Sequence, residues 1–213
     1  MKILNLYACL GGNRYKWNEV KEDIEVTAVE LDPELARLYQ ERFPNDTVIV
    51  ADAHQYLLDH YQEYDFIWSS PPCPTHSRMI LCRKNTMKIK YPNMKLYEEI
   101  LLLDKFYEGK YVVENVIPYY EPLISGQKRG RHLYWSNFEL PKSINERKSP
   151  EMKGKGCIER FSIYHNYDFY KYKGKQHRGK MSRNLVDYEA GKVIFETMLG
   201  IVGKEVINQK ELF

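Results

Sequence analysis

The sequence predicts an α/β fold in which a mostly parallel, doubly wound sheet carries helices on both faces. Two observations support this prediction. Short apolar runs of strand type alternate with segments of helical spacing along the first half of the chain. Polar or acidic residues follow the ends of these runs, and the strand ends of a parallel sheet gather at one edge. We therefore expect a ligand site at the carboxyl edge of the sheet.

Three predicted strands open the chain, at 2–7, 25–30 and 47–50. The glycine turn Gly11-Gly12 follows the first strand, and it allows the backbone to approach a ligand closely where a helix is expected to begin. Glu30 ends the second strand and Asp52 follows the third. An acid about 20 residues after a glycine turn is typical of the carboxylate that binds ribose hydroxyls in nucleotide-binding units.

The predicted helices lie between these strands and after them. Asp32 is a typical helix N-cap because Pro33 follows it at the first helical position. Apolar residues at helical spacing then predict helices over 33–43, 53–61 and 95–107, and a closing helix over 188–202.

A fourth apolar run, 64–68, leads into a short stretch that carries a cysteine. Pro71 and Pro72 directly precede Cys73, and proline fixes the φ angle and donates no N–H. The loop is therefore stiff, and Cys73 is a candidate nucleophile held at the sheet edge. The alternative interpretation is a structural cysteine after a tight turn.

The later chain continues the pattern and then changes in composition. Residues 78–92 resemble a basic loop, 111–113 a fifth strand that leads into Glu114-Asn115-Val116, and 132–135 a further strand. Residues 141–180 hold eleven Lys or Arg against four Asp or Glu and are rich in Tyr, although they show no clear period. This mixture favours a polyanion with exposed bases as the partner, although it is also compatible with a solvated surface. We expect a core over 1–140, a basic segment over 141–183, and a returning helix plus tail over 184–213.

Composition limits the class of protein. The chain has 213 residues, a formal net charge of +3 and four cysteines without a paired metal-ligand spacing. Neither a zinc site nor a disulfide framework is indicated. No signal peptide or membrane span is predicted, so we expect a cytoplasmic protein without a membrane partner. Because the cysteines lack a metal-ligand spacing, we also expect no bound metal.

Taken in order, these motifs resemble the DNA (cytosine-5) methyltransferase family. The resemblance depends on the glycine turn, the two strand-end acids, Pro72-Cys73, the Glu-Asn-Val element and a later Gln-x-Arg-x-Arg element at 127–131. It implies a Rossmann-like, S-adenosylmethionine-dependent methyltransferase fold and methyl transfer to C5 of cytosine in DNA.

The resemblance also implies a role for each catalytic side chain. Cytosine C5 is a poor nucleophile, but addition of a thiolate at C6 gives an enamine-like ring that can accept a methyl group. Cys73 would be that nucleophile, Glu114 the acid at N3 and Arg131 the contact to O2, while Arg129 would brace the catalytic loop. The base would have to leave the duplex, because a stacked ring shields C6.

For the methyl donor S-adenosyl-L-methionine, the resemblance implies that Glu30 binds the ribose, Asp52 the adenine amine, and the two glycines the methionine end. The full expected set is Tyr7, Gly11, Gly12, Glu30, Leu31, Asp52, Ala53, Pro71 and Asn184. The expected DNA contacts are Ser77, Arg78, Lys171, Lys173 and Lys175.

The chain departs from the family pattern in three places. Cys9 stands where the family has the first glycine of its turn, and Pro74 stands where the family has glutamine after the catalytic cysteine. Only about 45 residues, roughly 141–183, replace the long target-recognition domain. Sequence specificity would therefore be low or supplied by a partner chain.

Other functions remain open from sequence. Ser70-Pro71-Pro72 fits the first part of the loop of amino-methylating DNA enzymes, although Cys73 replaces the aromatic residue expected next. An RNA cytosine-5 methyltransferase and a non-catalytic nucleic-acid-binding subunit of the same fold are further alternatives.

The final residues suggest a separate partner. Gln209, Leu212 and Phe213 match short Gln-x-x-Leu-Phe peptides that dock on bacterial and phage DNA sliding clamps. Such a partner would place the protein in the cytoplasm of a bacterial or phage-infected cell. The alternative is that the apolar pair folds onto the protein's own core.

Overall fold

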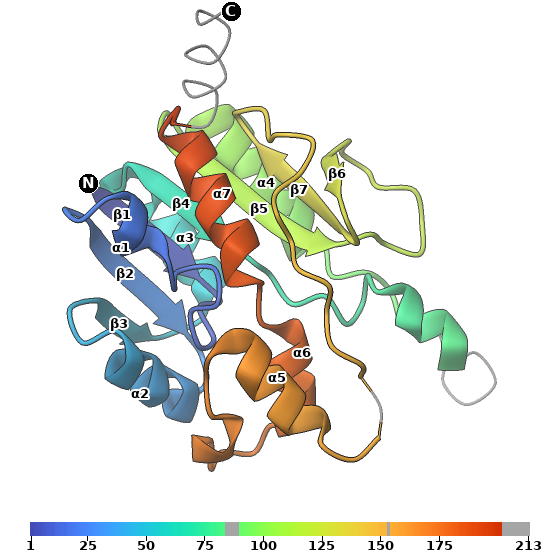
Figure 1. Cartoon of the computed structure of the whole chain (residues 1–213). Coiled ribbons are helices and arrows are strands. Elements are labelled where there is room, and N and C mark those ends of the chain that lie inside the picture. The colour runs from blue at the N-terminus through green and yellow to red at the C-terminus, as the bar shows by residue number, and fades with distance from the viewer. Residues whose placement is uncertain (84–89, 153, 202–213) are drawn as a thin grey trace, which may run out of the picture.

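The central sheet of the protein carries helices on both faces. The structure is a computed structural model and describes residues 1–83, 90–152 and 154–201. Its strands are β1 (Lys2–Leu6), β2 (Glu25–Glu30), β3 (Thr47–Val50), β4 (Phe66–Ser69), β5 (Lys110–Val116), β6 (Gln127–Arg129) and β7 (His132–Ser136). In the described part they form one sheet in the order β3-β2-β1-β4-β5-β7-β6 (Figure 1). Strands β1 to β5 pair in parallel, whereas β7 is antiparallel to both β5 and β6.

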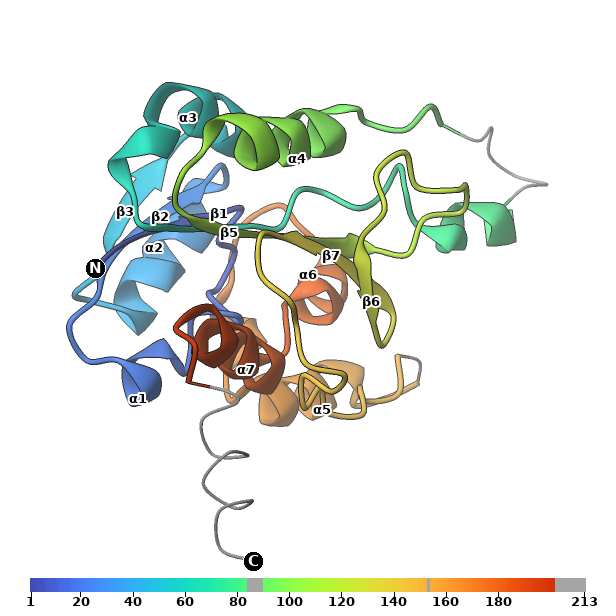
Figure 2. The same cartoon turned by 90° about the horizontal axis from the view of Figure 1, so that it is seen from above.

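The helices form two layers around this sheet. They are α1 (Trp17–Val20), α2 (Pro33–Arg42), α3 (Ala53–His60), α4 (Lys95–Phe106), α5 (Cys157–His165), α6 (Arg178–Asn184) and α7 (Tyr188–Met198), with short 3-10 turns at Tyr61–Glu63, Arg78–Arg83 and Phe169–Lys171. Helices α3 and α4 cover one face of the sheet, and α1, α2 and α7 lie on the other (Figure 2).

Neighbouring residues of the central strands are buried on opposite faces. Leu4 and Val113 pack in the cluster under α3 and α4, whereas Ile3 and Val112 pack in the cluster with α1 and α7. All four are fully buried. Burial on both faces explains why these strands are continuous apolar runs rather than alternating ones.

We call residues 157–184, from α5 to the end of α6, the cap segment. Its buried Phe161, Phe169 and Met181 pack with Leu35 and Leu38 of α2 in one apolar cluster. The cap segment is therefore attached to the core through α2, at the carboxyl edge of the sheet.

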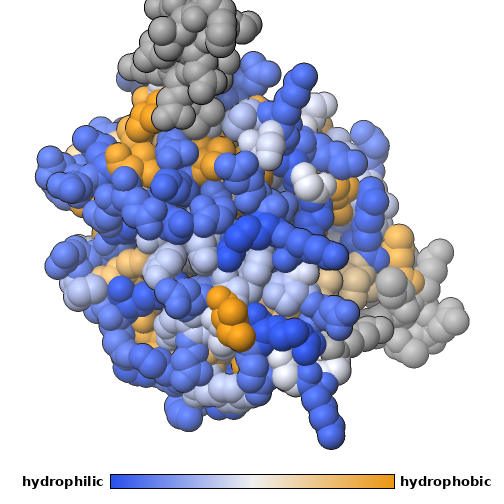
Figure 3. Space-filling model, in the orientation of Figure 1, coloured by the Kyte–Doolittle hydropathy of each residue, from blue (hydrophilic) through white to orange (hydrophobic). Residues whose placement is uncertain are grey.

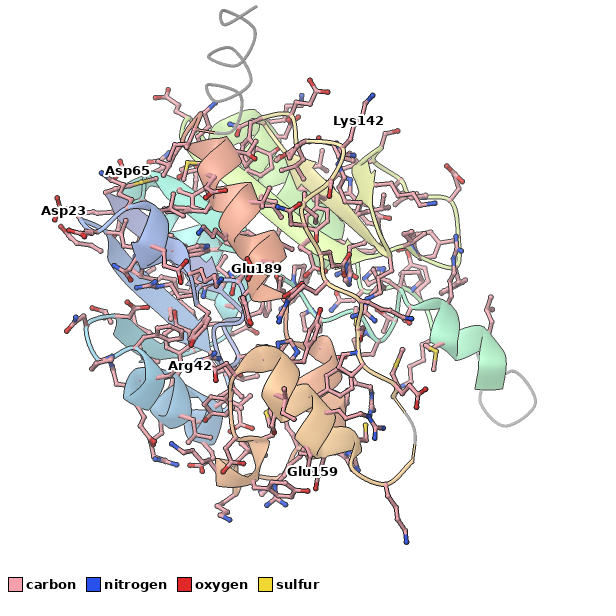
Figure 4. The ribbon with its side chains drawn as sticks, in the orientation of Figure 1. Asp23, Arg42, Asp65, Lys142, Glu159 and Glu189 are labelled. Carbon is pink, nitrogen blue, oxygen red and sulfur yellow. The ribbon has the colours of Figure 1, made fainter. Side chains whose placement is uncertain are left out.

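Arg42 fastens the cap segment to the glycine turn. Figure 4 shows Arg42 between α2 and α5. Its guanidinium donates to the carbonyl oxygens of Leu10 at 2.8 Å and of His165 at 3.1 Å. Its charge lies over the rings of Tyr15 and Tyr167, at 4.4 and 5.0 Å from their centroids. One side chain thus joins the turn after β1 to α5.

The predicted fold class is confirmed, and β2 and β3 have the predicted bounds. Strand β5 is longer than predicted and includes Glu114 to Val116, because β7 pairs with it from Val112 to Val116. Strand β6 and the cap helices α5 and α6 were not predicted. In the expected loop 78–92, Arg78–Arg83 form a 3-10 turn.

No long helix begins at the glycine turn, contrary to the prediction. The chain forms turns there, followed by the four-residue α1. Two buried polar side chains hold these turns: Asn13 donates to Asn5 Oδ1 at 2.8 Å, and Arg14 pairs with Asp46 at 2.9 Å. Because these long-range partners fix the backbone, local helix signals do not decide its path.

Candidate active site

A cavity of about 1860 Å³ lies along the carboxyl edge of the parallel strands, and the cap segment forms its opposite wall. The face of the molecule seen in Figure 3 is mostly hydrophilic, with small apolar areas. The predicted site residues that line the cavity are Tyr7, Gly12, Glu30, Leu31, Asp52, Ala53, Pro71, Cys73, Ser77, Arg78, Glu114, Arg131, Lys175 and Asn184. The structure therefore brings most of the predicted site to one place.

The turn after β1 forms one end of the cavity and has an unusual backbone. Tyr7 and Cys9 have positive φ angles of 55° and 48°, and Gly11 has 65°. A side chain at Cys9 is therefore held in the left-handed region that glycine prefers, which explains why the related family has glycine there. A Cβ at Gly12 would lie 2.3 Å from the carbonyl oxygen of Val186, so only glycine lets the chain after α6 lie against this turn.

Glu30 closes the turn from the neighbouring strand. Its carboxylate accepts the backbone N–H groups of Cys9 and Asp32, each at 2.9 Å. Burial raises the pKa of Glu30, and these two N–H groups oppose the increase. A carboxylate has about four acceptor sites, so Glu30 can still accept a hydroxyl group from a ligand.

Asp52 holds the end of the next strand in a similar way. It caps α3 by accepting the N–H groups of His54 and Gln55 at 2.9 and 3.2 Å, and Lys95 Nζ lies 3.5 Å from it. These contacts, with the Gln55 N–H first, lower the pKa of Asp52. The carboxylate is therefore charged at neutral pH and can accept from an amino group.

The residues present fit S-adenosylmethionine. Two carboxylates, Glu30 and Asp52, line the cavity at the ends of adjacent strands, and Leu31, which follows Glu30 and also lines the cavity, is 67% exposed. A large apolar side chain left exposed at a polar edge is suited to an aromatic base. The two acceptor carboxylates and the exposed leucine together suit an adenosine group.

Cys73 lies on the loop that follows β4, and hydrogen bonds fix this loop. Asn115 of β5 donates its side-chain N–H to Pro71 O at 2.9 Å, and the N–H groups of His76 and Ser77 both reach Cys73 O at 3.0 Å. Burial raises the pKa of the Cys73 thiol, and the Glu114 carboxylate raises it further.

Two cationic groups act on the Cys73 thiol in the opposite direction. Lys180 of the cap segment and Arg131 both lower its pKa, although by less than burial raises it. A base or ligand that brings positive charge near the thiol would shift the balance toward the reactive thiolate.

Glu114 is buried, at 8% exposure, and its carboxylate faces His132, which is not among the predicted site residues. His132 Nε2 lies 3.5 Å from Glu114 Oε1, and His132 Nδ1 lies 3.6 Å from Glu146 Oε1. The available sequence signal was the position of His132 directly after the Gln-x-Arg-x-Arg element.

The two arginines of that element differ in their surroundings. Arg129 donates to the carbonyl oxygens of Leu140 and Pro141, so it fixes the chain that leaves β7 rather than the loop of Cys73 as expected. Arg129 lies on β6, the edge strand that pairs with β7 and is not a neighbour of β4 in the sheet. Arg131 is 47% exposed at its side chain, with Nε 3.8 Å from Glu146.

The expected DNA-contacting lysines are also separated. Lys175 lines the cavity, whereas Lys171 is in an ion pair with Glu41 at 2.8 Å and Lys173 donates its backbone N–H to Glu34. Arg78 lines the cavity and donates to Pro118 O at 3.2 Å.

The predicted clamp peptide, with Gln209, Leu212 and Phe213, lies outside the described residues. Among the described residues, no group of three or more His, Cys, Asp or Glu could hold a metal ion. No helix within that part of the chain is long and apolar enough to cross a membrane.

Comparison with known proteins gives a family and several similar solved structures. A family model described as C-5 cytosine-specific DNA methylase matches residues 1–118. A mutant of DNMT2 from Spodoptera frugiperda is 25% identical with a TM-score of 0.39, and the match covers 54% of this chain and 35% of that one. A hypothetical protein of Thermus thermophilus is 21% identical with a TM-score of 0.42, covering 63% and 73%. A putative DNA modification methyltransferase encoded within an E. coli prophage is 16% identical with a TM-score of 0.37, covering 57% and 33%. No curated protein matches the chain.

Proposed function

Because this chain belongs to the C-5 cytosine-specific DNA methylase family, we propose that it methylates C5 of cytosine in DNA through a covalent bond from Cys73. The family uses S-adenosylmethionine, which supplies the methyl group as an electrophile. One observation carries the proposal for this chain. Cys73, on the loop after β4, and Glu114, on the adjacent strand β5, line the same cavity as the strand-end carboxylates Glu30 and Asp52.

Cys73 would begin the reaction at the cytosine ring. Its thiolate forms a bond to C6, and the ring electrons shift toward C5 and N3. Glu114 donates a proton at N3, which neutralises the charge that develops there, and the Arg131 guanidinium stabilises O2. C5 then accepts the methyl group. Loss of the C5 proton and cleavage of the bond from sulfur to C6 release the product and restore the thiolate.

The methyl donor would lie at the other end of the cavity. Glu30 would accept the ribose hydroxyls and Asp52 the adenine amine, because both carboxylates retain acceptor capacity. The remaining proposed contacts, which follow the family resemblance, are Tyr7, Gly11, Gly12, Leu31, Ala53, Pro71 and Asn184.

We assign DNA contact to the basic segment 141–183, as a reduced target-recognition region, together with Ser77 and Arg78. The support is that Lys175, Lys180 and Arg78 line the cavity that contains Cys73. Since this region is short, sequence specificity would be low or would come from a partner chain.

A covalent trapping experiment tests the reaction. With S-adenosylmethionine, a duplex that contains 5-fluorocytosine should form a stable protein–DNA adduct. Fluorine replaces the C5 hydrogen, so no proton can be lost from C5 and the bond from sulfur to C6 is not cleaved. Cys73→Ala should abolish both adduct and turnover while S-adenosylmethionine still binds. Cys157→Ala is the matched control, since Cys157 lies on α5 in the cap segment, and it should form the adduct normally.

An adduct that persists in Cys73→Ala would refute the assigned nucleophile. Mapping the labelled methyl group by nucleoside analysis separates the alternatives. A product at N4 or N6, or a product formed on RNA but not on DNA, would replace the proposed reaction. Absence of any methyl transfer by the wild-type protein would favour a non-catalytic binding subunit.

A further inference from the structure

His132 lies between two carboxylates and faces one with each ring nitrogen. Nε2 is 3.5 Å from Glu114 Oε1, and Nδ1 is 3.6 Å from Glu146 Oε1. Imidazole is the side chain that exchanges protons near neutral pH, and its two nitrogens can bind a proton on one side while releasing one on the other. A histidine in this position can therefore link the two carboxylates.

The sheet register explains why His132 reaches Glu114. In the antiparallel pair of β5 and β7, Glu114 lies opposite Tyr134, and Val116 lies opposite His132. His132 and Glu114 are therefore diagonal neighbours on one face of the sheet, within reach of long side chains. The T-shaped contact between His132 and Tyr134, with centroids 6.3 Å apart, orients the imidazole.

Exposure increases along this row of side chains. The exposed fraction of the side chain is 11% for Glu114, 17% for His132 and 21% for Glu146. Glu114 is thus the most enclosed member, and Glu146 is the most accessible to water. A proton that enters at Glu146 meets His132 before Glu114.

Other groups face the row from each neighbouring element. The Arg131 side chain comes from the β6–β7 turn, with Nε 3.8 Å from Glu146 Oε1, and Cys73 comes from the loop after β4. The Tyr134 phenol lies close to Glu114 and Glu146, and burial and these carboxylates raise its pKa well above the usual value. Tyr134 is therefore neutral and cannot replace His132 as the group that gains and loses a proton.

The reaction proposed above places a specific demand on Glu114. When the thiolate adds to C6, N3 takes a proton from the Glu114 carboxyl group. Glu114 is enclosed, so direct protonation by bulk water is restricted, and a bound base would restrict it further. A neighbour that returns a proton to Glu114 would keep the acid in its active form.

We propose that His132 is a positioning residue that passes protons between Glu146 and Glu114. As Glu114 gives its proton to N3, the N–H at His132 Nε2 moves to the Glu114 carboxylate, and Nδ1 takes a proton from Glu146 or from water beside it. When sulfur leaves C6, the N3 proton returns along the same route, so no net proton is consumed by the row. This inference rests on the proposed cytosine methylation.

Two variants test it, with the wild type measured in the same assay. His132→Gln keeps a polar side chain of similar reach but cannot relay a proton between two carboxylates. We expect kcat to fall about tenfold to a hundredfold at pH 8 and much less at pH 6, because solvent protons then replenish Glu114. The KM for DNA and the affinity for S-adenosylmethionine should stay close to the wild-type values. At each pH, the kcat of the variant is divided by the kcat of the wild type. This ratio cancels the pH dependence that comes from the Cys73 thiol, because both proteins have that thiol.

His132→Ala gives a second readout by chemical rescue. Added imidazole should restore part of kcat in this variant, while His60→Ala, a substitution of a half-buried histidine at the end of α3, should neither lose activity nor respond to imidazole. Circular dichroism checks that each variant is folded. If His132→Ala does not fold, the pH dependence of His132→Gln alone tests the inference.

A loss of kcat that is equal at pH 6 and pH 8 and is not rescued by imidazole would mean that His132 only supports the structure. Unchanged kcat in both variants would also overturn the inference while leaving the methylation intact. If the wild type makes no 5-methylcytosine, the proposed function fails first, so the two failures are distinguishable.

Discussion

Gly12→Ala is expected to disturb the site through the backbone alone. A Cβ at this position would lie 2.3 Å from Val186 O and 2.6 Å from Leu185 Cγ. Real Cβ atoms do not approach so closely, and a backbone carbonyl cannot rotate out of the way as a flexible side chain can. The segment between α6 and α7 would have to move away from the turn after β1, and it would carry Asn184 with it.

The size of the effect follows from the geometry of overpacking. A forced shift of packed backbone costs roughly 1–3 kcal/mol of unfolding free energy. For a chain of this length, each kcal/mol lowers the Tm by about 2–4 °C. Thermal unfolding followed by circular dichroism should therefore show a decrease of about 2–12 °C, and isothermal titration should show weaker binding of S-adenosylmethionine.

Gly179→Ala is the matched control. This glycine is the second residue of α6, and an added Cβ would lie 3.1 Å from the end of Arg183 and from the His177 ring, which are both side chains that can adjust. Alanine has the higher helix propensity, by about 1 kcal/mol in a helix interior and by less at a helix end. The control should be neutral or more stable. A Gly12→Ala protein with unchanged Tm and unchanged cofactor affinity would refute the close approach seen here.

Two further predictions concern acid stability and DNA affinity. His165 is buried and burial lowers its pKa from 6.5 to about 4, so the unfolded state binds a proton first as the pH falls. The unfolding free energy should therefore decrease by up to about 3 kcal/mol as the pH falls from 6.5 to 4. Urea titrations at each pH should show that His165→Phe removes this decrease. An unaltered pH dependence in the variant would contradict the assignment. Lys175 lines the cavity whereas Lys171 is paired with Glu41. Lys175→Gln should reduce the slope of log DNA affinity against log salt concentration by about one, and Lys171→Gln should reduce it by less. Equal slopes for both variants and the wild type would show that neither lysine contacts phosphate.

The sequence by itself determined the sheet and the chemistry at its edge. Short apolar runs bounded by polar or turn residues mark the strands, so the positions of β2 and of the partly exposed edge strand β3 could be predicted to the residue. Polar residues that follow such strands must reach the same edge in a parallel sheet. The convergence of Glu30, Asp52 and Cys73 on one cavity therefore followed from strand order and the ends of the strands.

Only the tertiary structure decided the parts that depend on partners distant in sequence. Strand β6 has the polar sequence Gln-Lys-Arg, without an apolar period, and it exists because β7 pairs with it. The same hairpin directs Arg129 to Leu140 and Pro141 rather than to the catalytic loop.

The cap segment and His132 illustrate the same limit. Residues 157–184 have no clear period because their apolar side chains pack against α2 and the turn after β1, not along one regular face. His132 became part of the site because the antiparallel register places it diagonally across from Glu114. Local propensity and periodicity carry no information on register between strands, since register is set by the packing of both strands in the folded sheet.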